Sequence, residues 1–141
     1  MGRLVKSGSA SKDRILLERG IVLALRELVH QPNPDDNTRD LIAYITLSLW
    51  AIADTIDESV GAWEKRGYWV KADRFRMEWN WTKSLGDNLY RSAIEDDWVS
   101  LAQISAQVGE KLKAVKIPQR HHMGTPWVGA WQRLISPKQG H

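Results

Sequence analysis

The chain has 141 residues with a net charge of +3, eight tryptophans and no cysteine. This length suits one domain with an apolar core, and the absence of cysteine excludes a disulfide framework, thiolate catalysis and cysteine-ligated zinc. Because no apolar run approaches the roughly 20 residues that cross a bilayer, we expect a cytoplasmic protein with no membrane partner.

The first predicted elements are a flexible N-terminal arm over residues 1–10 and a helix over residues 11–30. Ser11 and Asp13 are the candidate caps of this helix, and Gly20 in its interior costs about 1 kcal/mol relative to alanine. Two prolines in residues 31–35 end the helix, because each disfavours helix in the residue before it. The apolar stripe consists of Ile15, Val22, Leu25 and Val29, widened by Leu17, Ile21 and Leu28.

A second helix is predicted over residues 36–65, with Asp36 or Asn37 as its cap and Gly67 either ending it or lying inside one long bent helix. Its first half is apolar around most of its circumference, which is typical of a helix buried on more than one side. The inner stripe consists of Ile42, Ile45, Leu49, Ile52, Ala53, Ile56, Val60 and Trp63.

The polar side of the second helix carries Asp54, Asp57 and Glu58 at spacings of three and four residues. Such a set could bind a hard cation, but the Glu-x-x-His elements of metal sites in helical bundles are absent from the sequence. We interpret these carboxylates as a solvated or inter-subunit acidic face. A carboxylate-dependent metal enzyme remains a third hypothesis for the chain.

A third helix is predicted from Tyr68 to Ile94, and it includes most of the basic and aromatic stretch AWEKRGYWVKADRFRMEWNW at residues 62–81. At 100° per residue, the positions in line with Phe75 form a core-facing stripe and the others form a second binding surface. The core-facing positions are Tyr68, Ala72, Phe75, Trp79, Thr82, Gly86, Leu89 and Ala93. The outward positions are Trp69, Val70, Arg74, Arg76, Met77, Asn80, Trp81 and Arg91.

Glu95, Asp96 and Asp97 precede a fourth helix predicted over residues 97–116. Residues 118–141 contain two tryptophans and no acid, and their pattern supports at most a short turn from Trp127 to Ile135. We therefore expect an all-α protein, a four-helix antiparallel bundle over residues 11–117 with an irregular basic C-terminal tail over residues 118–141 that docks on a neighbour. The stripe of the fourth helix is Trp98, Leu101, Ile104, Val108, Leu112 and Val115.

The sequence has no nucleotide-binding loop, hydrolase elbow or zinc-protease motif, so we expect no enzyme activity and no cofactor. His121 and His122 form the one adjacent histidine pair. Neighbouring residues point in different directions in most backbones, and no second set of ligands has zinc-like spacing. We expect these histidines to make surface or tail contacts and expect no metal site.

Basic and aromatic residues occur together, and this combination has two interpretations. Lys and Arg neutralise phosphates while Trp and Tyr rings stack on unpaired bases, each stack contributing roughly 1–3 kcal/mol. Arg and Trp are also typical of hot spots in protein interfaces. The candidate nucleic-acid contacts are Lys71, Arg74, Arg76, Lys83, Arg91, Lys113, Lys116, Arg120 and Arg133. The candidate partner contacts are Trp69, Met77, Trp81, Trp127 and Trp131.

Residues 50–81, above all the string ESVGAWEKRGYWVKADRFRMEW, resemble the helical small subunits of type III CRISPR effector complexes. The resemblance covers roughly a quarter of the chain and also rests on its size and helical content. It implies a noncatalytic bundle that stacks in copies along the crRNA–target duplex and contacts large backbone subunits and the target strand. No residue role is carried over, and the acidic second helix departs from a uniformly basic surface.

From these features we expect a noncatalytic structural subunit of a multisubunit ribonucleoprotein, which the resemblance places in antiviral defence. Its Lys and Arg side chains would fix phosphates of RNA or single-stranded nucleic acid, and its aromatic side chains would anchor other subunits. The alternative is a protein–protein adaptor or homo-oligomeric bundle with no nucleic-acid role, in which the same aromatic residues bind protein.

Overall fold

The computed structural model describes residues 9–136, which form six helices and no strand, so the predicted all-α class is confirmed. Within these residues, no helix has the length and apolar character needed to cross a bilayer. Features predicted for residues 1–8 and 137–141 lie outside the described residues. The helices are α1 (Ala10–Leu28), α2 (Asp36–Lys65), α3 (Trp69–Trp79), α4 (Trp81–Ile94), α5 (Trp98–Lys111) and α6 (Ala130–Ile135).

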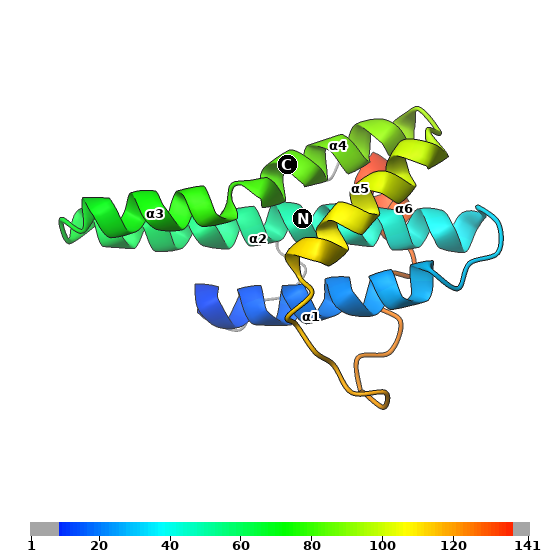
Figure 1. Cartoon of the computed structure of the whole chain (residues 1–141), viewed down its shortest axis with the longest axis horizontal. Coiled ribbons are helices and arrows are strands. Elements are labelled where there is room, and N and C mark those ends of the chain that lie inside the picture. The colour runs from blue at the N-terminus through cyan, green and yellow to red at the C-terminus, as the bar shows by residue number, and fades with distance from the viewer. Residues whose placement is uncertain (1–8, 137–141) are drawn as a thin grey trace.

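Helix α2 lies at the centre of the fold, with α1, α3, α4 and α6 packed around it and α5 packed on α4 (Figure 1). Residues 41–46 are all buried, and Ile45, Leu49 and Ile52 have no accessible surface. A helix can be shielded from water on several sides only where its apolar residues are not confined to one stripe. The prediction that this helix is buried on more than one side is therefore confirmed.

Helix α3 packs mainly against the C-terminal part of α2, and the two helices extend together from the rest of the molecule (Figure 1). We call residues 60–79 the projection. Helix α2 ends before Gly67, whose φ of +82° lies in the left-handed region that glycine adopts without steric cost. The Tyr68 N–H donates to the Trp63 carbonyl oxygen at 2.9 Å and closes the turn. Gly67 thus ends the second helix, as one of the two predicted alternatives had it. The other alternative, one long bent helix that contains Gly67, is wrong.

The single helix predicted to begin at Tyr68 is interrupted at Asn80, between α3 and α4. The Thr82 hydroxyl donates to the Trp79 carbonyl oxygen at 2.8 Å and competes there with the helical backbone pattern. Trp79 and Trp81 stack across the interruption, with ring centroids 6.1 Å apart. The prediction that Tyr68 faces the core is wrong: the side chain is 52% exposed, because Tyr68 precedes α3 in a non-helical conformation.

Helices α1, α2 and α5 each begin after a residue whose side chain accepts a hydrogen bond from the first turn. These residues are Ser9, Asp35 and Asp97. Asp97 belongs to the predicted acidic start of its helix. The caps predicted for the first two helices lie further along the chain, because hydrophobic periodicity does not show where the first turn begins.

Acid is expected to weaken the fold through two of these caps. The Thr38 N–H lowers the pKa of Asp35, and the Ser100 hydroxyl lowers the pKa of Asp97. Because both pKa values are lower in the folded chain, the stability they contribute is present above pH 3.8 and is lost as pH falls through the folded values. Between about pH 5 and pH 2, we expect the urea midpoint to fall less in Asp97→Asn than in the unmodified chain, since asparagine caps without titrating. Equal falls would contradict this.

The C-terminal segment is part of the fold, in contrast to the predicted irregular tail that docks on a neighbour. Trp127 is only 5% exposed, and α6 packs against α2. The Asp40 carboxylate accepts hydrogen bonds from the backbone N–H groups of Gly129 and Trp131, at 3.0 and 2.9 Å. Helix α6 has six residues, fewer than two turns, and so leaves almost no periodic signal in the sequence.

Candidate nucleic-acid interface

The inner side of the projection is an aromatic contact between α2 and α3. Trp63 and Phe75 meet edge to face with ring centroids 4.8 Å apart, and the Phe75 and Trp79 centroids are 6.4 Å apart. Such pairs add about 0.5–1.5 kcal/mol each beyond the apolar area that they bury. Phe75 and Trp79 both pack against the core, as predicted for the core-facing stripe. Phe75 joins α3 to α2 through Trp63, and Trp79 extends the aromatic cluster along α3.

Arg14 joins α1 to the base of the projection. Its guanidinium carbon lies 4.9 Å from the centroid of Phe75, and the group donates to Thr55 Oγ1 and Ser59 Oγ at 3.2 and 3.1 Å. Burial lowers the pKa of Arg14, an effect that the nearby Glu18 opposes. Arg14 was not among the residues predicted from the sequence. Its position in line with the apolar stripe of its helix could have indicated a buried contact.

The outer side of α3 is exposed, as the predicted second surface requires. Trp69, Val70 and Met77 are 59%, 67% and 72% exposed. Trp81 differs, because it is half-buried and lies beneath Lys111, whose Nζ is 5.9 Å from the ring centroid. Lys111 was not among the predicted contacts. Of the three candidate partner contacts near α3, Trp69 and Met77 are open to a partner and Trp81 is partly covered by the chain itself.

The two candidate partner tryptophans near the C-terminus pack within the chain. The role expected of Trp127 is wrong, because its ring already belongs to the core. Trp131 is half-buried, with the Arg39 guanidinium carbon 5.7 Å from its ring centroid. Arg39 also lies over Trp98 at 5.3 Å and pairs with Asp96 at 2.8 Å. These contacts hold the start of α6 against α2 and α5 instead of presenting it to a neighbour.

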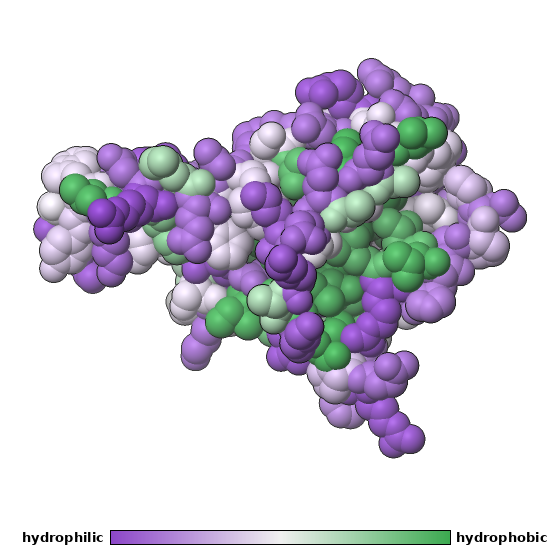
Figure 2. All heavy atoms as spheres, viewed as in Figure 1, coloured by the Kyte–Doolittle hydropathy of each residue, from purple (hydrophilic) through white to green (hydrophobic). Residues whose placement is uncertain are grey.

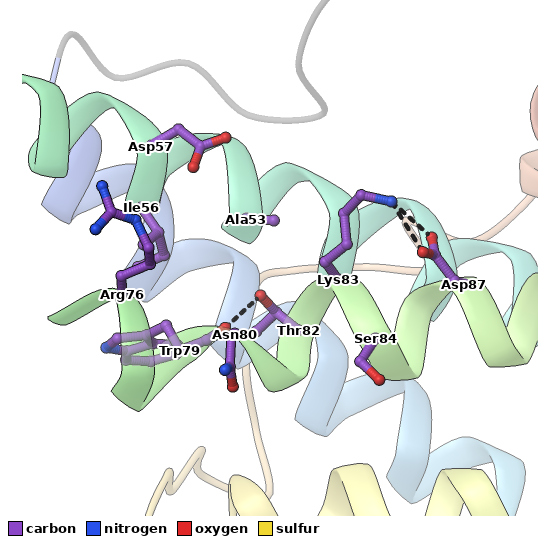
Figure 3. Close-up of a pocket in the computed structure, with 10 residues that line it drawn as sticks. All are labelled: Ala53, Ile56, Asp57, Arg76, Trp79, Asn80, Thr82, Lys83, Ser84 and Asp87. Atoms are coloured by element: carbon purple, nitrogen blue, oxygen red, sulfur yellow. Dashed lines mark hydrogen bonds and ion pairs between the residues drawn. The ribbon is translucent and has the colours of Figure 1, made fainter. Parts of the chain in front are cut away.

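A groove of about 480 Å³ runs between α2 and the α3–α4 pair, at the interruption near Asn80. Figure 3 shows Arg76 and Lys83 extending towards α2 from α3 and α4, with Ala53 between them and Asp57 on the α2 side. The groove therefore has Arg76, Lys83 and the carboxylate of Asp87 on the α3–α4 side and the carboxylate of Asp57 on the α2 side. Its lining residues are Ala53, Ile56, Asp57, Arg76, Trp79, Asn80, Thr82, Lys83, Ser84 and Asp87.

Both cations of the groove are paired within the chain. Arg76 binds Glu64 and Asp73 at 2.9 and 2.8 Å, and the hydrogen bond with Glu64 raises the pKa of Arg76. Lys83 binds Asp87 at 2.9 Å. Exposed ion pairs contribute only about 0–1 kcal/mol, so these pairs hold the two cationic side chains weakly.

The nine candidate nucleic-acid contacts do not form one continuous patch. Lys71, Arg74 and Arg76 lie on α3, while Lys83 and Arg91 lie near opposite ends of α4. The others lie elsewhere: Lys113 pairs with Glu110 at 2.8 Å just beyond α5, and Lys116 and Arg120 are exposed in the segment that follows. Arg133 is half-buried on α6, with its Nε enclosed. The structure thus brings Arg76 and Lys83 together in one groove, and places Lys71 at the far end of α3 and the C-terminal set on other elements.

The carboxylates and histidines considered for metal chemistry are scattered. Asp54, Asp57 and Glu58 are exposed on α2, as expected of an acidic face. Within residues 9–136, no group of three or more His, Asp and Glu side chains is placed to hold a metal ion. The Met123 N–H donates to His121 Nδ1 at 3.2 Å, and His122 is exposed, so the histidine pair makes a local backbone contact and a surface contact.

The site therefore combines cations that can bind phosphate, an exposed indole and exposed apolar side chains on one well-packed projection. Arg76 and Lys83 line the same groove. Trp69 lies seven residues before Arg76 on α3, close to two helical turns, so these two side chains leave α3 on the same side. Comparisons with protein-family models, curated proteins and solved structures found no match for this chain.

Proposed function

We propose that the chain is a noncatalytic structural subunit of a multisubunit ribonucleoprotein, comparable to the small subunits of type III CRISPR effector complexes that residues 50–81 resemble. In this proposal the subunit is cytoplasmic, needs no cofactor and contacts the crRNA–target duplex and neighbouring subunits. Helices α1, α2, the α3–α4 pair and α5 would supply the four-helix antiparallel bundle of such a subunit. The observation that carries the proposal is the groove lined by Arg76 and Lys83, with exposed Trp69 two helical turns before Arg76 on α3.

The proposed mechanism is positional, and any reaction takes place elsewhere in the complex. A strand that follows the groove places phosphates beside Arg76 and Lys83, which exchange their carboxylate partners for the phosphate oxygens. An unpaired base stacks on Trp69, whose ring is open to solvent. Arg74 adds positive charge on the neighbouring side of α3. Phosphate contacts of this kind fix position and carry no sequence information.

Binding of a labelled single-stranded RNA, measured by fluorescence anisotropy over a range of salt concentrations, tests this function. We expect binding at low salt with a steep salt dependence. Arg74→Ala combined with Arg76→Ala should weaken binding and reduce the slope of log K against log salt by about 0.7 for each lost phosphate contact. Lys12→Ala is the matched control, because Lys12 is an exposed cation at the start of α1. The absence of binding at low salt, or equal loss in the control, would exclude direct RNA contact.

A protein–protein adaptor or homo-oligomeric bundle is the second candidate, favoured by an apolar groove between the end of α1 and the start of α5. Figure 2 shows hydrophobic side chains gathered on the surface between these two helices. The groove has a volume of about 200 Å³, and Leu28, Ile42, Trp98 and Leu101 contribute to its lining. Self-association in sedimentation, lost in Ala102→Arg at the groove's edge, would support this candidate if RNA does not bind.

A further inference from the structure

The end of the projection, residues 65–71, is an exposed tip with three adjacent apolar or aromatic side chains. Tyr68, Trp69 and Val70 are all more than half exposed. Figure 2 shows a small hydrophobic group beside pale, near-neutral groups and strongly hydrophilic ones at this end of the molecule. Single exposed apolar residues are ordinary on protein surfaces, but a contiguous exposed group rimmed by charge marks a contact site.

Positive charge surrounds these three side chains. The tip contains Lys65, Arg66 and Lys71 and no acid. All three cations are exposed, and Lys71 lies with its Nζ 4.5 Å from the Trp63 ring centroid. The acids that flank the tip in sequence both pair with Arg76, at 2.9 and 2.8 Å. The charge that the tip presents to a partner is therefore positive.

The tip is preorganised and extends beyond the rest of the molecule. The left-handed turn at Gly67 and the hydrogen bond from the Tyr68 N–H to the Trp63 carbonyl oxygen set its conformation. Figure 1 shows it at one extreme of the long axis, beyond the start of α1 and far from α5 and α6. A flat partner can therefore meet the tip without touching the body, and little conformational entropy is lost when it does.

We propose that this tip docks on an anionic phospholipid surface. Tyr and Trp rings favour the depth of the lipid headgroups, where the apolar ring and the polar O–H or N–H group are both satisfied. A small apolar side chain such as Val70 adds area at the boundary with the acyl chains. Each Lys or Arg near an anionic surface contributes about a fivefold increase in affinity. Tyrosine, tryptophan and three cations on one convex turn match these requirements together.

This inference goes beyond the proposed RNA contact, which uses Arg76, Lys83 and the groove and shares Trp69 with the tip. The expectation of no membrane partner rested on the length of apolar runs, which bears on spanning a bilayer and not on docking at its surface. Tyr68, Val70, Lys65 and Arg66 belong to the tip alone. Their replacement therefore separates a lipid contact from an RNA contact that depends on Arg76 and Lys83.

Co-flotation of the full chain with vesicles tests the proposal, using phosphatidylcholine with about 30% phosphatidylglycerol against pure phosphatidylcholine. We expect binding to the anionic vesicles that weakens as salt rises. Lys65→Gln with Arg66→Gln should lower the affinity roughly 25-fold, the product of two fivefold losses. Tyr68→Ser with Val70→Ser should also weaken binding. Lys12→Gln and Val99→Ser, at an exposed cation and an exposed valine outside the tip, should leave it unchanged.

The proposal is overturned if the unmodified chain does not float with anionic vesicles at low salt, or if the control variants lose as much binding as the tip variants. Circular dichroism and urea unfolding of every variant show whether a loss comes from the tip or from misfolding. Single-stranded RNA binding is measured on the same proteins. Tip variants that lose RNA binding but retain vesicle binding would assign the tip to the RNA site and reject the lipid contact.

Discussion

Replacement of Trp127 by alanine is expected to lower the free energy of unfolding by about 3–5 kcal/mol, the usual cost of removing a buried tryptophan. The indole is 5% exposed and belongs to the core with Ala130 at the start of α6. A helix of six residues has no stability of its own, so without the indole α6 should separate from α2. Urea unfolding gives the free energy, and limited proteolysis should cleave earlier between α5 and α6.

Trp69→Ala is the matched control for this prediction. Its indole is 59% exposed on the projection, so its removal should change the free energy of unfolding by less than about 0.5 kcal/mol. If the two alanine variants instead have the same small effect, the C-terminal segment does not belong to the core in solution. The irregular tail expected from the sequence would then be the better description.

Replacement of Gly86 by alanine is expected to destabilise the fold by about 1–3 kcal/mol, although alanine is the better helix former. A Cβ atom at this position would lie 2.8 Å from both Cδ1 and Nε1 of Trp50 and 3.4 Å from Leu49 Cβ. The Trp50 ring cannot move freely, because its Nε1 donates to Asp87 at 2.9 Å and its centroid lies 5.6 Å from that of Tyr90. Helices α2 and α4 would have to separate.

Gly61→Ala is the control, because it makes the same substitution at a helical position where a Cβ atom has room. Nothing lies within 4 Å of a Cβ atom added at Gly61, so alanine should stabilise α2 by up to about 1 kcal/mol. The two glycines should thus respond with opposite sign in the same urea titration. A stabilised Gly86→Ala variant would show that α2 and α4 are not in close contact at this position.

Hydrophobic periodicity predicted the positions of the long helices and the buried stripe of α2, because both follow from the sequence of each helix alone. It was wrong for part of α1, where the predicted stripe residues Ile15 and Val29 are 56% and 79% exposed because α1 packs on α2 through the side that carries Leu17, Ile21 and Ala24. It did not explain Gly20, which was expected only to weaken its helix. In the structure the Tyr44 hydroxyl occupies the place of a Gly20 Cβ atom, so the glycine lets α1 approach α2. The close contact that requires glycine at this position comes from α2, and the hydrophobic pattern of α1 contains no information about that contact.

In the candidate site too, features that depend on one helix were predictable from the sequence, and contacts between distant segments were not. The exposure of Trp69 and Met77 followed from helical geometry, and the spacing of Lys83 and Asp87 is that of an ordinary ion pair on a helix. The pairing of Arg76 with Glu64 depends on the turn between α2 and α3, and the burial of Trp127 depends on contacts far apart in the sequence. Contacts between segments far apart in the sequence determine which of the predicted site residues remain accessible to a partner.

The continuity of α2 fixes the position of the projection relative to the body of the molecule. This helix of 30 residues is roughly 45 Å long and belongs to the body at one end and to the projection at the other. No hinge separates the two parts along it, since the backbone hydrogen bonds of one helix run through both. A ligand bound at the tip and another bound on the body would therefore be kept at a constant separation and orientation, so the chain can serve as a rigid spacer.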